Sequence, residues 1–383
     1  MGITKLYSDF VGNDKSAGIT LIICTILSII IANSAFHTDY HAFWSTQLPL
    51  GNLEFWINDG LMAIFFLFVG LELKREIYTG ELSNVKAALL PIFAAIGGVL
   101  VPAGIFLFFN YGTPTQAGAG IPMATDIAFA LGVLTLLGNR VPLGMKIFLT
   151  ALAVIDDLMA IVVIGIFYTS NFSLVYLLGA LEVLGILGIC NKFKVNSIII
   201  YLIGGVIAWY LMLQSGVHAT IAGVVLAFTI PFSEKNSLSE WLEHKLAKPV
   251  AFLILPLFAL ANTAIEIDQA AVDGLTHVNS IGIFLGLVVG KPLGIFVFSL
   301  LVISLGICKL PTGVRWIQLF SVACLAGIGF TMSIFITNLA FTNHEDIVIS
   351  KMAILISSTL AALIGYVFLS ITLAKSNAGK IEE

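Results

Sequence analysis

Apolar segments of helix length recur along the whole chain, and this feature most restricts its fold. They lie between Ala17 and Leu373 and are separated by short polar stretches. A membrane-spanning helix needs about 20 mainly apolar residues, because the hydrocarbon core of a bilayer is about 30 Å thick. The sequence therefore predicts an all-α polytopic membrane protein. Its twelve transmembrane helices are expected at 17–35, 55–78, 87–109, 118–137, 145–168, 174–190, 198–213, 217–231, 249–265, 281–305, 315–340 and 347–373.

The composition excludes several other classes of protein. Only 10% of the residues are charged, against about 25% in a soluble domain. The net charge of -4 is spread along the chain, so no basic stripe is available for a nucleic acid. The cysteines occur singly, without the spacing of zinc ligands. No nucleophile and base pair or metal-ligand cluster is recognisable, so we expect neither an enzyme nor a cofactor.

The distribution of Lys and Arg predicts the orientation in the membrane. The loops near 36–54, 110–117, 169–173, 214–217, 266–280 and 341–346 contain neither residue, whereas the opposite loops contain many. The positive-inside rule therefore places both termini in the cytoplasm, and an even number of spans agrees. Lys351 and Lys291 fall outside the pattern. Lys351 is close enough to the outer end of its span to extend to the interface.

Five charged residues lie near the middles of predicted spans, namely Asp126, Asp156, Asp157, Glu182 and Lys291. A charge at the centre of a membrane helix costs about 2.5 to 3.5 kcal/mol. These groups must therefore pair, line water or be neutral. Adjacent helical residues point about 100° apart, so Asp156 and Asp157 face different directions. Lys291 is the one intramembrane cation that the predicted spans offer.

Neighbouring buried carboxylates suggest a particular chemistry. Burial and a nearby like charge both disfavour the ionised form, so protons can compete with a hard monovalent cation for the carboxylate oxygens. A site that holds either two protons or one sodium ion moves one net charge per cycle, and the membrane potential can then drive sodium export. The alternatives are buried structural hydrogen-bonding groups, an ion channel, and a sodium-coupled symporter. A symporter would need a polar pocket that the sequence does not indicate.

Two predicted spans contain stretches that favour a break in the helix. Residues 118–126 are rich in Gly and Pro and end at Asp126, and residues 326–331 contain two glycines. Interrupted helices in corresponding positions point to inverted repeats, here spans three to five and ten to twelve. Half-helix ends carry partial charges that Asp126 and Lys291 could offset. On this interpretation Asp126 stabilises the break, and the alternative is that it takes part in cation or proton binding.

These residues, in this order, resemble the NhaA family of sodium/proton antiporters over nearly the whole chain. The stretches that carry the resemblance are 65–76, 122–129, 155–157, 215–220, 290–294 and 327–333. The resemblance implies that Asp157 is the main Na+ ligand, and that Asp156 shares the cation and exchanges a proton or a salt bridge with Lys291. It also implies that Thr125 and Asp126 lie where the unwound helices cross. Which of Lys291 and Asp156 releases the second proton stays open.

The resemblance also implies pH regulation from the cytoplasmic side, through residues that would be Glu72, Arg75, Glu76, His218, Glu243 and His244. The residues themselves allow simpler roles. Charges at a span end often pair on a solvated face, and His218 could be a hydrogen-bonded structural histidine. Ala247 stands where the family can have a histidine, and Lys245 and Lys248 add positive charge, so we expect a shifted pH profile. Glu182 has no counterpart in the family pattern.

The resemblance further implies alternating access in a bacterial inner membrane. The core bundle would be 87–168 and 281–373, and the panel 17–78 and 174–265. Residues 37–53 would form an extramembrane β-hairpin through which a homodimer assembles, although an ordinary loop is the alternative there. The expected partners are sodium or lithium, protons and membrane lipid. The preference between sodium and lithium is not predicted.

Overall fold

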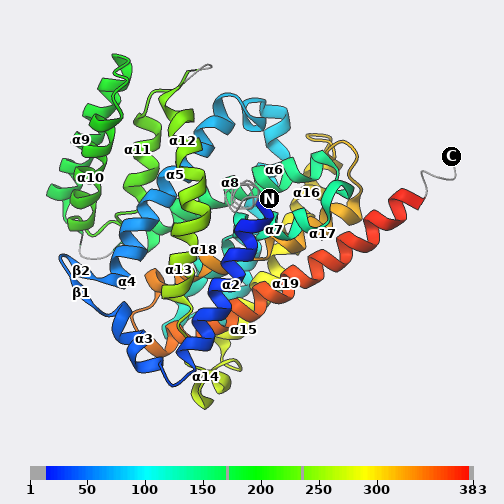
Figure 1. Cartoon of the computed structure of the whole chain (residues 1–383). Coiled ribbons are helices and arrows are strands. Elements are labelled where there is room, and N and C mark those ends of the chain that lie inside the picture. The colour runs from blue at the N-terminus through cyan, green and yellow to red at the C-terminus, as the bar shows by residue number, and fades with distance from the viewer. Residues whose placement is uncertain (1–13, 170–171, 234–236, 379–383) are drawn as a thin grey trace, which may run out of the picture. The chain divides into compact units, whose positions relative to one another are not determined.

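The computed structural model describes residues 14–169, 172–233 and 237–378, in which helices dominate (Figure 1). The α-helices are α2 (Asp14–Ala32), α3 (His37–Trp44), α4 (Leu53–Phe55), α5 (Met62–Tyr78), α6 (Val85–Asn110), α7 (Ile127–Leu136), α8 (Leu143–Phe167), α9 (Leu174–Lys192), α10 (Ile198–Gln214), α11 (Ile221–Thr229), α12 (Leu238–Pro249), α13 (Leu255–Asn262), α14 (Gln269–Gly274), α15 (Val278–Leu285), α16 (Lys291–Ser304), α17 (Trp316–Ala326), α18 (Phe330–Ala340) and α19 (His344–Ala378). The 3-10 segments are η2 (Glu81–Ser83), η3 (Pro114–Met123) and η4 (Gly138–Arg140), and the π segments are η1 (Trp56–Leu61), η5 (Val250–Ile254) and η6 (Gly286–Gly290).

Seven continuous helices in the described residues are long and apolar enough to cross a membrane. They are Leu53–Tyr78, Val85–Asn110, Leu143–Phe167, Leu174–Lys192, Leu238–Asn262, Val278–Ser304 and His344–Ala374. The number rises to ten if each of three bent helix pairs counts as one span. The protein is therefore an all-helical, multi-span membrane protein with broken helices.

The segment expected to span at 217–231 is shorter than predicted. Only α11 is helical there, and its nine residues extend about 14 Å at 1.5 Å per residue. Its start is delayed by a turn in which Gly216 has a φ of +78°. Its end comes before Pro231, because Ile230 adopts the extended conformation that a residue before proline favours.

The chain forms two compact units. The first contains the described parts of 1–37, 84–160 and 263–383, and the second contains the described parts of 38–83 and 161–262. Helix α8 contributes to both, with the division after Ala160. Helix α2, which the sequence analysis grouped with the panel, falls in the first unit because it packs on α7.

The packing of the first unit depends on helices that approach closely. Helix α6 packs along α15, η6 and α16. A side chain at Gly97 of α6 or Gly294 of α16 would collide with the carbonyl of the other glycine. Small residues allow such close approach between membrane helices, where van der Waals packing drives association. This contact fixes the start of α16, the helix that carries Lys291.

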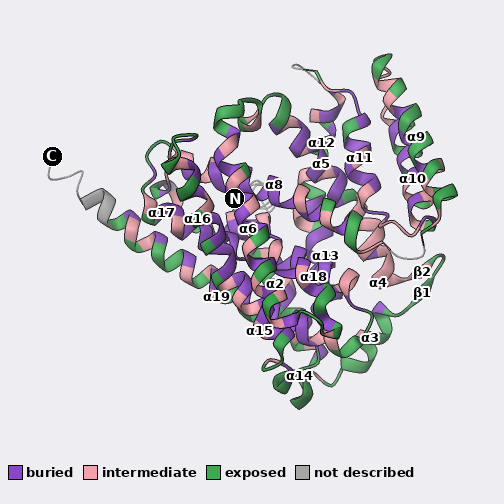
Figure 2. Ribbon diagram, turned by 180° about the vertical axis from the view of Figure 1, so that it is seen from behind, coloured by how far each residue is buried: buried purple, intermediate pink, exposed green. Residues whose placement is uncertain are grey.

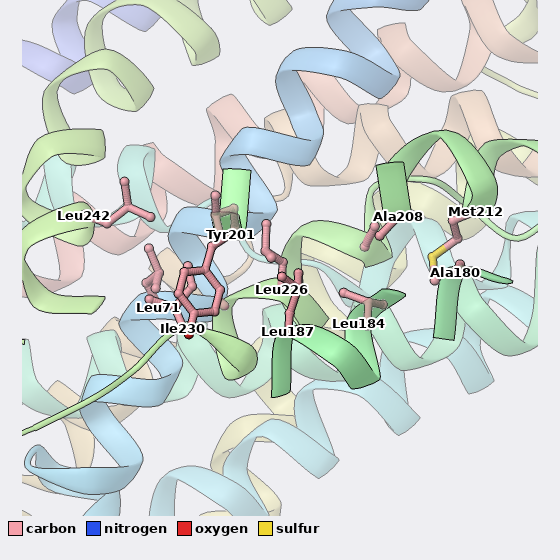
Figure 3. Close-up of a cluster of buried hydrophobic side chains, with 13 residues drawn as sticks. Leu71, Ala180, Leu184, Leu187, Tyr201, Ala208, Met212, Leu226, Ile230 and Leu242 are labelled. Carbon is pink, nitrogen blue, oxygen red and sulfur yellow. The ribbon is translucent and has the colours of Figure 1, made fainter. Parts of the chain in front are cut away.

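The second unit has its own apolar core (Figure 3). Helix α5 packs on α11, and α9 packs on α10. The buried side chains of this core are Leu67, Leu71, Ala180, Leu184, Leu187, Tyr201, Ala208, Met212, Ala222, Leu226, Ala227, Ile230 and Leu242. Away from the core, many residues of α9 and α10 are exposed (Figure 2), and many of these are large and apolar. Glu182 is exposed near the middle of α9.

The expected hairpin at 37–53 is smaller than predicted. Strands β1 (Gln47–Leu48) and β2 (Gly51–Asn52) pair antiparallel, but residues 37–44 form helix α3 instead of a strand. The turn is held by the indole N-H of Trp56, which donates to the Pro49 carbonyl at 2.8 Å. The prediction of a strand was wrong for α3 because alternating apolar and polar residues over such a short window do not separate strand from helix.

Candidate functional site

The centre of the first unit contains a fully buried ion pair. Lys291 Nζ lies 3.0 Å from Asp156 Oδ2, and neither side chain is exposed to solvent. Lys291 opens α16 directly after the π segment η6. π turns are frequent at functional sites. The two residues that the sequence predicted to interact therefore do so.

Thr125 joins this pair from the break in the fourth predicted span. Its Oγ1 lies 2.7 Å from Asp156 Oδ2 and 2.9 Å from the Ala326 carbonyl. A hydroxyl has one proton to donate, so it serves one of these acceptors at a time. Asp156 Oδ1 has no hydrogen-bond partner among the described residues. One carboxylate oxygen is thus shared by two donors, and the other is available to a ligand.

Asp157 follows Asp156 on α8 and is also buried. It lies close enough to Lys291 for an electrostatic interaction. The described residues contain no group of three or more His, Cys, Asp or Glu side chains arranged to hold a metal ion. The site instead offers two carboxylates and a hydroxyl. Oxygen donors of this kind suit hard cations such as Na+.

Two broken helices meet at this site. Segment η3 and α7 bend by 42° at their junction, and α17 and α18 bend by 45° at theirs. The sequence predicted both breaks. The backbone N-H of Asp126 donates to the Ile328 carbonyl at 2.6 Å, so the two unwound segments bond directly to each other.

Asp126 caps both helices that start at these breaks. Its Oδ1 accepts from the N-H of Phe129 at 2.9 Å in the first turn of α7. Its Oδ2 accepts from the N-H of Thr331 at 3.1 Å and from the Thr331 hydroxyl at 2.5 Å, in the first turn of α18. A carboxylate at a helix N-terminus satisfies orphan donors and offsets the helix dipole. Asp126 thus bonds to the first turns of both helices that follow the breaks.

Two serines at the breaks were missed by the sequence analysis. Ser333 Oγ of α18 donates to the Ile121 carbonyl of η3 at 2.7 Å. Ser358 Oγ of α19 accepts from the N-H of Phe330 at 3.1 Å. Ser333 lies inside a stretch that carries the family resemblance, which was the available signal. Nothing in the sequence indicated its partner.

A second group of charges lies at the end of α5 in the second unit. Arg75 contacts Glu76 and Glu243, with Nη1 and Nε each 2.8 Å from a carboxylate Oε1. Glu76 also accepts from the backbone N-H of Glu81. Glu72, one turn earlier, interacts electrostatically with all three. The predicted cluster of Glu72, Arg75, Glu76 and Glu243 is therefore assembled.

The two histidines predicted to act with this cluster also lie in the second unit, where His244 directly follows Glu243 on α12. His244 is exposed and lines a cavity of about 420 Å³ with Asn196, Ser237, Leu238, Glu240 and Trp241. His218 is partly buried, and its Nε2 lies 2.8 Å from the Tyr168 carbonyl. His218 thus has the hydrogen bond expected of a structural histidine.

Lys74, at the end of the predicted span 55–78 that is expected on the cytoplasmic side, is buried in the structure. It is 3% exposed, and its Nζ donates to the carbonyls of Ala227, Phe228 and Ile230 at 3.2, 3.0 and 2.5 Å. Lys351 is also buried, whereas the sequence analysis extended it to the interface. The described residues therefore contain three buried lysines, Lys74, Lys291 and Lys351. The sequence places Lys74 and Lys351 near span ends, but tertiary contacts bury them.

Comparisons with known proteins agree with the resemblance. The family described as Na+/H+ antiporter 1 matches residues 8–369. A protein of Cytophaga hutchinsonii named Na(+)/H(+) antiporter NhaA is 56% identical over 385 residues and covers 100% of both chains. Proteins of the same name from Flavobacterium psychrophilum and Citrobacter koseri are 59% and 50% identical. The alignments cover 96% of each chain in the first case, and 94% of this chain and 96% of the relative in the second.

Proposed function

The chain belongs to the NhaA family of Na+/H+ antiporters, and we infer that it exchanges Na+ for H+ across a bacterial membrane. This is a transporter family and not a family of enzymes. The transported ions are Na+ and H+, and we propose Li+ as an alternative cargo. We further propose the inner membrane as its location, with both termini in the cytoplasm. The absence of Lys and Arg from alternate loops supports that orientation.

We propose that Asp156 and Asp157 hold either one Na+ or protons, with Asp157 as the main cation ligand. The buried contact of 3.0 Å between Lys291 and Asp156 is the observation that carries this proposal. A buried charge needs a partner, so the ammonium compensates Asp156 when the site holds no cation. An incoming Na+ competes with the ammonium for the same carboxylate. Two protons exchanged for one Na+ make the cycle electrogenic.

The proposed transport cycle is alternating access. Twelve spans would form a core bundle (87–168 and 281–373) that contains the carboxylates, and a panel (17–78 and 174–265). Spans three to five and ten to twelve would be inverted repeats that each contribute one broken helix. Support comes from the breaks at 124–126 and 327–329, which lie beside the buried charges. Thr125 and Asp126 hold the crossing together, so the site can change its access without losing its geometry.

We propose regulation by pH through Glu72, Arg75, Glu76, His218, Glu243 and His244. In support, Arg75 is shared between two carboxylates, so protonation of either carboxylate would release one of its contacts.

Two further proposals follow from the resemblance. A homodimer would assemble through the hairpin of β1 and β2, and membrane lipid would cover the exposed faces of α9 and α10.

Exchange in everted vesicles tests the transport function. Added Na+ should dequench a pH-sensitive dye in vesicles that contain the intact chain, and Asp157→Asn should abolish the response. Glu182→Gln is the matched control, because Glu182 is also an acid near mid-span but is exposed on α9. It should transport normally. Full exchange by Asp157→Asn, or a Na+ current without proton movement, would contradict the proposal, and the current would favour a channel.

A further inference from the structure

The break after η3 leaves carbonyl groups without helical partners. The last carbonyls of a helix have no intrahelical donor, and in a membrane interior each must be satisfied by protein. Lys291 Nζ donates to the Met123 carbonyl, the last residue of η3. Ser333 Oγ donates to the Ile121 carbonyl at 2.7 Å. The end of η3 is therefore held by one charged and one neutral side chain.

The contact of Ser333 joins two different broken helices. Ser333 lies in α18, and Ile121 lies in η3, 212 positions earlier in the chain. Both residues are completely buried. Several other buried serines of the first unit donate within their own helix, as Ser357 does to the Ala353 carbonyl at 2.6 Å. The Ser333 hydroxyl instead donates a hydrogen bond from one broken helix to the other.

The neighbouring glycine provides a second observation. A Cβ at Gly329 would collide with Ser333 Oγ. The φ of Gly329 is -91°, so the backbone itself would accept another residue. The missing side chain at 329 leaves the space in which the Ser333 hydroxyl points toward η3. The two residues together keep this donor in place.

We propose that Ser333 is a positioning residue for ion exchange. It fixes the last turn of η3 and thereby the Met123 carbonyl, which shares the Lys291 ammonium with Asp156. The inference rests on the proposed function, in which Na+ competes with Lys291 for Asp156. When Na+ is bound, the Met123 carbonyl keeps the displaced ammonium in place. Without the Ser333 bond this carbonyl moves, and Lys291 stays on Asp156.

The expected consequence is a weaker apparent affinity for Na+ with an unchanged capacity for turnover. Ser333→Ala should raise the apparent KM for Na+ about tenfold, which corresponds to the loss of one buried hydrogen bond. The maximal exchange rate should stay within about twofold, because both carboxylates remain. Ser357→Ala is the matched control and should change neither parameter. The measurement is dye dequenching against Na+ concentration in everted vesicles.

The outcomes separate this inference from the transport function itself. If the intact chain exchanges Na+ and Ser333→Ala leaves the KM unchanged, the inference fails alone. An equal rise in Ser357→Ala also overturns it. If Ser333→Ala does not reach the membrane, Ser333→Cys tests the inference instead. Its thiol is a weaker donor of similar size, so the KM for Na+ should rise, but by less than tenfold, and an unchanged KM would overturn the inference. Gly329→Ala should raise the KM by displacing the hydroxyl. A lack of exchange by the intact chain defeats the proposed function instead.

Discussion

Lys291 and Lys74 are both buried, and both ammonium groups bond to backbone carbonyls at the end of a helix. Lys291 has one carboxylate and the last carbonyl of η3, whereas Lys74 has three carbonyls at the end of α11. The C-terminus of a helix carries a partial negative charge and unsatisfied acceptors. A buried ammonium is therefore tolerated at a helix end. The difference is that Lys291 can exchange its carboxylate partner, whereas the three hydrogen bonds of Lys74 all go to backbone carbonyls.

The first prediction concerns the stability that Lys74 provides. Lys74→Met keeps the length of the side chain but removes the donor to the carbonyls of Ala227, Phe228 and Ile230. Hydrogen bonds to charged groups contribute about 1.5–3 kcal/mol, so the thermal midpoint in detergent should fall. Lys245→Met, at an exposed position, is the control and should leave the midpoint unchanged. Equal midpoints for both variants would show that Lys74 does not hold α11.

The sequence revealed charged site residues far better than neutral ones. Asp126, Asp156 and Lys291 stand out because a charge inside an apolar run is costly and rare. Ser333 does not stand out, because serines in apolar helices commonly bond their own preceding turn. Only the tertiary structure shows that its acceptor lies in another broken helix. Polar partners that are distant in the chain leave no local pattern.

At the scale of elements, helix breaks were more predictable than helix lengths. Gly and Pro near 118–126 and 326–331 interrupt helix formation by known local effects, and both breaks are present. The short α11 was not foreseen, because the first residues of the expected span, 217–220, form a turn although they include the apolar Val217 and Ala219. The π segments η1, η5 and η6 were not foreseen either. One extra residue in a turn changes the side-chain direction without a clear sequence signal.

The second prediction concerns the contact between α5 and α11. A Cβ at Gly223 of α11 would collide with the Ala63 carbonyl and lie 2.9 Å from the Leu67 nitrogen of α5. Backbone atoms cannot move aside cheaply, so Gly223→Ala should separate the helices and cost about 1–3 kcal/mol. Gly185→Ala is the control, because a Cβ there meets nothing within 4 Å. Thermal unfolding in detergent should show a lower midpoint for the first variant only, and a reversed order would contradict this packing.

At the scale of the whole molecule, the third prediction tests the orientation. Gln269 and Lys245 are both exposed and lie in segments predicted to be on opposite sides of the membrane. In a background without the four native cysteines, Gln269→Cys should react with a membrane-impermeant maleimide in intact cells. Lys245→Cys should react only in everted vesicles. Labelling of both from the same side would refute the inferred topology and the cytoplasmic location of the termini.

The fourth prediction follows from the charge that one cycle moves. If two protons replace one Na+, each cycle carries one net charge across the membrane. Moving one charge through 100 mV corresponds to about 2.3 kcal/mol. An imposed potential of that size should therefore shift the equilibrium ratio of Na+ concentrations about fiftyfold, whereas one-for-one exchange would not respond to it.

Purified protein in vesicles with a potassium diffusion potential provides the measurement. With an inside-negative potential, Na+ should be driven out against its own gradient, and Asp157→Asn vesicles should show only the passive leak. A Na+ ratio that ignores the potential would show that the two carboxylates exchange a single proton for each cation.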